Sequence, residues 1–234
     1  MSKFSYGYKG FVCSVCGQDK LEDSEVLWPE LINAWQLSIE EVRYINRQQG
    51  SHCVFCKNNL RSLALAKAIL KAVFFEGTLL DFCQSSSNHR VLEINRAGNL
   101  TDSLQKLMNH RLIEYPKFDM GNLDIESESY DLVVHSDTLE HIPNPERALS
   151  ECHRVLSKGG KCIFTTPIIV DRMTRSRSGL TPSFHGQSNI QANDQLVYTE
   201  FGANFWQAVL KAGFSSCEIF SLEYPSALAI IASK

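Results

Sequence analysis

The 234-residue sequence lacks several features that would set it apart from ordinary globular proteins. It contains no apolar run near the roughly 18 residues that a transmembrane helix needs. The first residues, MSKFSYGYKGF, lack the apolar core of a signal peptide, and the chain has no internal repeat or low-complexity tract. These absences predict a cytoplasmic protein without a membrane partner.

An excess of charge of one sign is also missing. The chain has 23 basic and 26 acidic residues, which give a net charge of −3. The net charge of the whole chain therefore does not favour binding to a nucleic-acid backbone or to an anionic membrane surface. A local basic patch on the surface is still compatible with this charge. The hydrophobic content of 44% is enough to bury a core.

Cysteine, in contrast, is plentiful, and its spacing is informative. Of the eight cysteines, four form two C-x-x-C pairs, and the others are scattered singly. Cysteines of a cytosolic chain stay reduced, so two such pairs indicate a closed structural zinc site, with metal-free buried pairs as the alternative. The predicted metal ligands are Cys13, Cys16, Cys53 and Cys56. We assign them to a cysteine-rich zinc-binding module over residues 1–60.

The rest of the chain alternates between strand and helix patterns. A linking helix and connection are expected over residues 61–87, followed by one domain over residues 88–234. Strands are expected at 89–95, 110–116, 130–137 and 161–167, helices at 100–109 and 144–156, and a last helix at 204–214 precedes two strands at 217–225 and 227–234. This alternation predicts an α/β fold with a parallel sheet, helical crossovers and an antiparallel C-terminal hairpin.

The segment after the first strand of this domain is a candidate binding loop. Val91–Ile94 is followed by Asn95–Asn99, whose two small residues allow a ligand to approach the backbone. Ligands of open parallel sheets bind at the carboxyl ends of the strands. Taken singly, the residues have ordinary structural explanations, because Glu93 or Asp119 could cap a helix and Gly159-Gly160 is expected to form a turn.

A series of short motifs follows in a fixed order. The motifs are Asp119, Leu123-Asp124-Ile125, Tyr130-Asp131, Leu139-Glu140-His141, Arg154-Val155-Leu156 and Gly159-Gly160. In this order and spacing they resemble the class I methyltransferases of the small-molecule type 11 group. The resemblance covers roughly residues 88–234 and implies a Rossmann-like sheet with an antiparallel C-terminal hairpin and S-adenosylmethionine as the cofactor.

The resemblance also implies which residues bind that cofactor. They are Glu93, Asn95, Ala97 and Gly98 near the methionine part, Glu114 on the ribose hydroxyls, Asp119 and Met120 near adenine, and His135 in the lining of the cleft. The chain departs from the family pattern at Asn95, which replaces the usual first glycine. It departs again between Glu114 and Asp119, a span too short for the usual helix.

The reaction implied by this resemblance needs an aligned acceptor and, for a hydroxyl acceptor, a base. His185, in the long polar stretch 172–195, is the first candidate for the general base, and His141 and His135 are the reserves. His141 has a capping or packing role as its alternative. The candidate substrate-binding residues are Arg172, Arg175 and Arg177. They would hold a carboxylate or phosphate through forked hydrogen bonds, or else form a solvated basic loop.

Together these features predict an S-adenosylmethionine-dependent methyltransferase that methylates an oxygen of a small polar or anionic acceptor, such as a carbohydrate or a nucleotide-linked sugar. Some ribosomal-RNA guanine methyltransferases carry small N-terminal zinc modules, so an RNA base methyltransferase is an alternative. The acidic to neutral charge of residues 21–43 disfavours it. A scaffold protein without catalysis, whose zinc module recruits a partner, is the remaining alternative.

Overall fold

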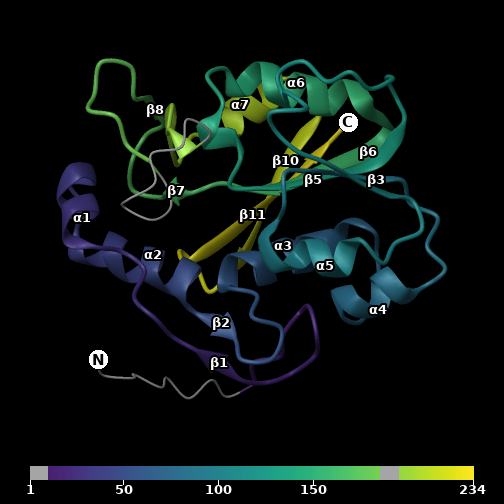
Figure 1. The fold of residues 1–234 in the computed structure, drawn as a ribbon, viewed down its shortest axis with the longest axis horizontal. Coiled ribbons are helices and arrows are strands. Elements are labelled where there is room, and N and C mark those ends of the chain that lie inside the picture. Colours follow the sequence, from purple (N-terminus) through teal and green to yellow (C-terminus); the bar gives the residue numbers. More distant parts are fainter. Residues whose placement is uncertain (1–9, 185–194) are drawn as a thin grey trace. The chain divides into compact units, whose positions relative to one another are not determined.

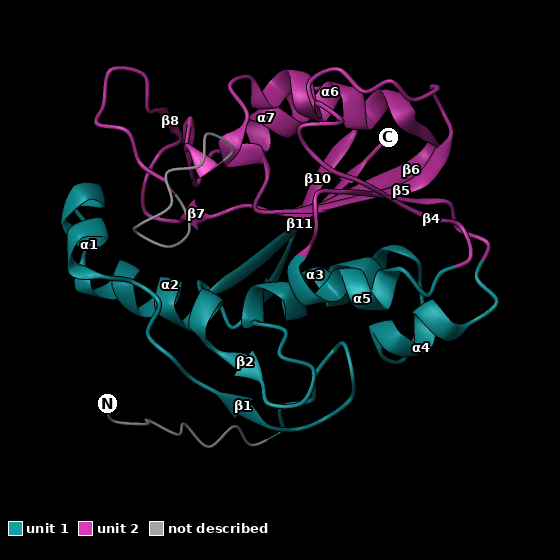
Figure 2. Ribbon diagram, viewed as in Figure 1, with its two compact units in different colours: residues 1–87, 98–107, 219–229 teal, residues 88–97, 108–218, 230–234 magenta. Residues whose placement is uncertain are grey.

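The computed structural model describes residues 10–184 and 195–234 (Figure 1). The chain forms two compact units, each assembled from separate parts of the sequence (Figure 2). Unit 1 comprises residues 1–87, 98–107 and 219–229, and unit 2 comprises residues 88–97, 108–218 and 230–234. The divisions predicted from the sequence were contiguous, whereas these units are not.

Most of a six-stranded sheet with the order β10-β11-β6-β5-β3-β4 belongs to unit 2, whereas residues 219–222 of β10 and 227–229 of β11 belong to unit 1. The strands of this sheet are β3 (Val91–Ile94), β4 (His110–Ile113), β5 (Tyr130–Ser136), β6 (Leu156–Thr165), β10 (Ser216–Leu222) and β11 (Ala227–Ser233). β3, β4, β5 and β6 pair in parallel, and β11 pairs antiparallel to β6. The predicted Rossmann-like α/β fold with antiparallel C-terminal strands is therefore confirmed.

The central strands of this sheet form because their residues are apolar and buried on both faces. All four residues of β3 are buried, as are the last five of β5. The helix α6 (Pro145–Val155) begins where the Asn144 side chain accepts a hydrogen bond from the Arg147 amide, and Pro145 occupies its first turn. Its buried residues recur at helical spacing, so one face of α6 packs into the core.

The glycine pair that was expected to form a turn lies inside a strand instead. Gly159 and Gly160 belong to β6, and the pairing with β5 shifts register between Tyr130 and Leu132. Gly159 has a φ of 74°, in the left-handed region that glycine tolerates best. The pair thus produces an irregularity that lets the strand continue.

Shorter elements complete unit 2. They are the 3₁₀ helix η2 (Leu139–His141), the strands β7 (Ile168–Ile169), β8 (Arg175–Ser176) and β9 (Thr199–Gly202), and the helix α7 (Trp206–Lys211). β7, β9 and β8 form a three-stranded sheet in that order. The polar stretch that was predicted to be a loop therefore contains a strand at β8.

Unit 1 contains most of the helices that precede the large sheet. Its elements are β1 (Leu21–Glu22), α1 (Pro29–Trp35), α2 (Ile39–Gly50), β2 (His52–Cys53), α3 (Leu60–Ala72), α4 (Leu79–Gln84), η1 (Gly98–Leu100) and α5 (Thr101–Leu104). α2 and α4 each begin with a reciprocal capping box, and α3 begins with an Asn59 cap. The predicted linking helix corresponds to α3, which is almost wholly buried.

The cysteine-containing loops are fastened to the helices of unit 1. The amides of Leu79 and Leu80 donate to the carbonyls of Ser14 and Val15, and the Ser14 hydroxyl donates to the Leu63 carbonyl at 2.8 Å. The loop around Cys13 is thereby held by α3 and by the first turn of α4. Across the two ranges that the structure describes, none of the helices has both the length and the apolar character needed to cross a membrane.

Candidate functional site

Unit 2 contains a cavity of about 480 Å³ at the carboxyl ends of β3, β4 and β5. The chain leaves β3, forms β4 on one side of it, and returns to form β5 on the other side. A reversal of this kind leaves a crevice beyond the ends of the strands, where open α/β sheets bind ligands. The lining residues are Ile94, Asn95, Arg96, Glu114, Tyr115, Phe118, Asp119, Met120, Ser136, Asp137, Thr138, His141, Ile142, Pro143 and Tyr198.

The loop after β3 owes its shape to two polar residues. Asn95 has a φ of 56°, the left-handed conformation that glycine adopts most easily and asparagine tolerates better than most other residues. Its side-chain oxygen accepts from the Tyr115 amide at 3.0 Å, and its own amide donates to the Ile113 carbonyl. Asn95 therefore joins the loops after β3 and β4, and it lines the cavity.

Glu93, within β3, holds the same loop through hydrogen bonds of its side chain. Its side chain is fully buried, accepts from the Ala97 amide at 2.8 Å, and lies 2.8 Å from Nε2 of His110. Neither Glu93 nor Ala97 is among the residues that line the cavity, and the bond between them holds the loop. Gly98, with a φ of 59°, belongs to unit 1.

The side of the cavity formed after β4 contains the remaining predicted contacts. Glu114 is exposed and follows β4 directly, while Asp119 and Met120 come from the turn that follows. Asp119 accepts from the Gly121 amide at 2.8 Å, which fixes its carboxylate at the turn. The Phe118 ring adds an apolar surface to the same lining. This side of the cavity therefore combines carboxylates, which can accept hydrogen bonds from the hydroxyls of a ligand, with an apolar surface suited to a flat ring.

The side formed after β5 contains a histidine with a defined orientation. Nδ1 of His141 lies 3.0 Å from the carbonyl oxygen of Leu196, so this nitrogen carries the proton and Nε2 is the basic one. Nε2 lies 3.6 Å from the buried Glu140 carboxylate, whose other oxygen accepts from Thr166. A positive charge that develops on the imidazole would be stabilised by this carboxylate.

His135, the other reserve base, lies outside the cavity lining. Its side chain is fully buried, and its ring stacks on Phe164 with 4.6 Å between the ring centres. Burial lowers the pKa of His135 to about 3, because a charged imidazole is poorly solvated there. The first candidate base, His185, lies outside the described residues.

The predicted substrate arginines are held by other residues. The carboxylate of Glu200, which is buried in β9, accepts from Arg177 and, at 2.5 Å, from Arg175. Arg177 also donates to the Thr181 carbonyl at 2.7 Å. None of the three arginines, Arg172 included, lines the cavity.

Several cavity residues were not predicted. Tyr198 lies at the start of the segment that enters β9, and its amide donates to the Glu140 carbonyl at 2.8 Å. No local pattern in the sequence marks this residue, because its approach to η2 depends on a long-range contact. Tyr115 and Phe118 follow a predicted strand end, and their position alone was a usable signal.

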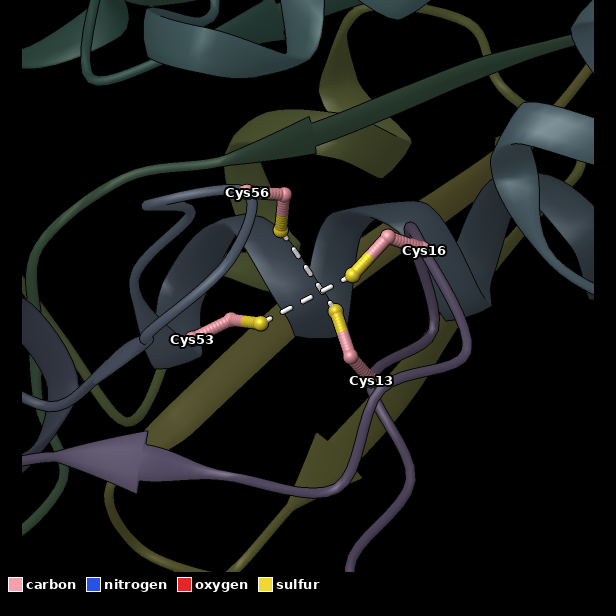
Figure 3. Close-up of side chains that lie close together, drawn as sticks. All are labelled: Cys13, Cys16, Cys53 and Cys56. Carbon is pink, nitrogen blue, oxygen red and sulfur yellow. Dashed lines mark hydrogen bonds between the residues drawn. The ribbon is translucent and has the colours of Figure 1, made fainter.

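The four paired cysteines of unit 1 come together around one point (Figure 3). Their sulfur atoms all lie within 4.8 Å of one another, with 3.6 Å between Cys13 and Cys56 and 3.7 Å between Cys16 and Cys53. Four thiolates bound tetrahedrally to zinc at about 2.3 Å would be separated by roughly 3.8 Å. All four cysteines are free of disulfides, so the sulfurs could hold a zinc ion.

Hydrogen bonding already favours a thiolate in this cluster. The bond from the Cys13 thiol, with help from the Asn58 side chain, lowers the pKa of Cys56 to about 4 although burial acts in the opposite direction. The same bond, together with burial, raises the pKa of Cys13. A cation at the centre would favour the thiolate form of every cysteine.

Comparison with known proteins agrees with the geometry. A family model described as "Methyltransferase domain" matches residues 76–164. Ubiquinone biosynthesis O-methyltransferase of Coxiella burnetii is 28% identical over 132 residues, which are 53% of this chain and 48% of that protein. The chain thus spans about half the length of the curated relatives it matches.

Among solved structures, the CurJ carbon methyltransferase has a TM-score of 0.50 and 16% sequence identity. The match covers 74% of this chain and 54% of the CurJ chain. A methyltransferase from Methanosarcina mazei has a TM-score of 0.41 and 12% sequence identity. The match covers 66% of this chain and 96% of the Methanosarcina chain. The first likeness concerns the fold alone. The family match therefore shows a methyltransferase-like stretch over residues 76–164, which is less than half of the chain.

Proposed function

We propose that this protein transfers a methyl group from S-adenosylmethionine to a hydroxyl oxygen of a small polar acceptor, and that a carbohydrate is the class of acceptor to test first. The observation that carries the proposal is the cavity at the ends of β3, β4 and β5, which combines cofactor-type carboxylates on one side with a histidine on the other. The relative from Coxiella burnetii is named an O-methyltransferase, which agrees with an oxygen acceptor.

The cofactor would occupy the side of the cavity nearest β3 and β4. The Glu114 carboxylate would accept hydrogen bonds from the ribose hydroxyls, and Phe118 and Met120 would pack against the adenine. Asn95, fixed by its bond to the Tyr115 amide, would set the loop beside the methionine part. When bound, S-adenosylmethionine supplies an electrophilic methyl group.

His141 is the proposed general base. Its Nδ1 proton is engaged by the Leu196 carbonyl, so Nε2 is the nitrogen that accepts the proton of the acceptor hydroxyl. Glu140 would stabilise the resulting imidazolium from 3.6 Å away. Asp137 and Tyr198, which line the same end of the cavity, would orient the acceptor through hydrogen bonds. His185 remains a second candidate for the base.

An anionic group on the acceptor has weaker support than the hydroxyl. Arg175 and Arg177 already contact Glu200, and a ligand anion would have to compete with a buried carboxylate for them. We therefore place a neutral sugar hydroxyl ahead of a phosphorylated acceptor.

We also propose that the four cysteines bind one structural zinc ion. The sulfur separations of 3.6 and 3.7 Å are close to those of a tetrahedral Cys₄ site. All four positions are filled by protein ligands, so such an ion would stabilise unit 1 and would not activate water.

Methyl transfer is tested by incubating the protein with methyl-labelled S-adenosylmethionine and a panel of sugars, with mass spectrometry of the products. Once an acceptor is found, His141→Gln should lower kcat by about 10²- to 10⁴-fold while cofactor affinity stays unchanged. His153→Gln is the matched control, since His153 packs edge-on against Phe214 outside the cavity lining. Equal kcat values for wild type and His141→Gln would remove His141 from the role of base.

A further inference from the structure

A second group of metal-ligating side chains lies in the core of unit 2. It consists of His135 on β5, Cys152 on α6 and Cys162 on β6, and one donor atom of each lies within 4.8 Å of the others. The sequence scatters these residues singly, and it is the packing of α6 on adjacent strands that unites them. All three are fully buried.

The hydrogen-bonding capacity of the His135 side chain is not explained by the packing around it. Neither of its ring nitrogens has a hydrogen-bond partner among the described residues, although the side chain has no exposed surface. A buried polar atom without a partner is rare in native proteins, and an ion or water is the usual explanation. The ring is held in place by stacking on Phe164, so its nitrogens keep a fixed direction.

We propose that His135, Cys152 and Cys162 bind a second thiophilic d¹⁰ cation, either Zn²⁺ or Cu⁺. Two sulfurs and one imidazole nitrogen are the donor types that these ions prefer. Metal–donor bonds of about 2.0 to 2.3 Å would bring the three donors to within roughly 4 Å of one another. The three donor atoms already lie within 4.8 Å of one another, so only small side-chain shifts are needed.

The charge balance suits a buried site. Binding Zn²⁺ forms two zinc–sulfur bonds and one zinc–nitrogen bond and releases the two thiol protons to solvent, with no change of oxidation state. The zinc complex with two thiolates and a neutral imidazole carries no net charge, which limits the cost of burial. A neutral imidazole binds zinc through a ring nitrogen without losing a proton. Zinc sites with three protein ligands complete their coordination with water.

The test is a count of zinc and copper per chain in protein purified without chelators. Cys152→Ala should lose one metal equivalent relative to wild type, whereas Cys83→Ala, a matched change at another buried cysteine, should lose none. If the metal lost in Cys152→Ala is zinc, the site binds Zn²⁺, and if it is copper, the site binds Cu⁺. Equal metal content in wild type and Cys152→Ala would overturn the proposal.

A native mass spectrum of the wild type covers the case in which Cys152→Ala does not fold. Two ions per chain are expected, of which Cys16→Ser removes only one. One ion per chain that Cys16→Ser removes would overturn the proposal while leaving the Cys₄ site intact. The outcome is independent of methyl transfer, because metal content is measured without cofactor or acceptor.

Discussion

Asn95 illustrates how one residue can replace another when the backbone demand is the same. The family pattern has a glycine at this position, and the φ of 56° explains why. Asparagine is among the few other residues that enter the left-handed region readily. Its side chain adds a bond to the Tyr115 amide that glycine could not make.

We therefore expect Asn95→Val to destabilise the loop, since a β-branched residue at positive φ costs about 1–2 kcal/mol. Urea unfolding should show this loss, and cofactor affinity should fall with it. Asn95→Gly is the matched control, because it keeps the backbone conformation and removes only the side-chain bond. A valine variant as stable as the glycine variant would contradict the assignment of strain.

The residue scale also shows the limit of motif-based prediction. Four of the residues that the resemblance implied for the cofactor line the cavity, because they follow the ends of strands: Asn95, Glu114, Asp119 and Met120. Glu93 was expected at the ligand, yet its carboxylate bonds to the Ala97 amide and to His110. A sequence gives the position of a carboxylate along the chain but not the direction in which it points.

At the scale of elements, β8 and β9 are joined by an ion pair that the sequence did not reveal. Glu200 is 4% exposed and contacts Arg177, which is 8% exposed, as well as Arg175. The arginines were predictable as a basic cluster. Their partner Glu200 was not predictable, because it follows the arginines by more than 20 residues in the sequence.

Glu200→Gln should cost roughly 3 kcal/mol of unfolding free energy, because it leaves the buried Arg177 cation without its carboxylate. Arg175→Gln should cost less than about 1 kcal/mol, since the Arg175 side chain is half exposed. Urea denaturation of both variants makes the comparison. Similar losses for the two would indicate that burial does not govern this pair.

A second ion pair links the start of β5 to the residue before β3. Asp131 accepts from Arg90 at 2.6 Å and from Ser157 at 3.0 Å, and chiefly the Arg90 bond lowers the pKa of Asp131 to about 2. The folded pKa lies below the unfolded value of about 3.9. The stabilisation is therefore complete above that value and is lost as pH falls towards 2.

Asp131→Asn should accordingly reduce the unfolding free energy at pH 7 by about 1 kcal/mol, a value reduced from the full linkage because Arg90 is partly exposed. The difference between variant and wild type should shrink between about pH 4 and pH 2. Urea titrations at several pH values measure it. A difference that stays constant with pH would show that the charge of Asp131 is not responsible.

Most elements were predictable because their signals are local. The buried strands, the capped α6 and the C-terminal hairpin follow from apolar spacing, caps and turns. The helix expected at 100–109 is only η1 and the short α5, and Gly159 continues a strand instead of forming a turn. In both cases tertiary packing decided between local alternatives of similar energy.

At the scale of the whole molecule, the cluster of Cys13, Cys16, Cys53 and Cys56 and the cavity belong to different compact units. If zinc holds unit 1 together, Cys16→Ser should speed amide hydrogen exchange in residues 10–60 and leave β5 and α6 protected. Hydrogen exchange with mass spectrometry measures both regions at once. Unchanged exchange in residues 10–60 would show that the cysteines do not need a metal to keep their fold.

The central claim is that the cavity beyond β3, β4 and β5 binds S-adenosylmethionine, and calorimetric titration of the wild type tests it most directly. The account predicts saturable binding of one equivalent, weakened about tenfold in Glu114→Gln through loss of a ribose contact. Glu128→Gln, an exposed change outside the cavity lining, should bind like the wild type. Absence of binding by folded wild-type protein would contradict the account.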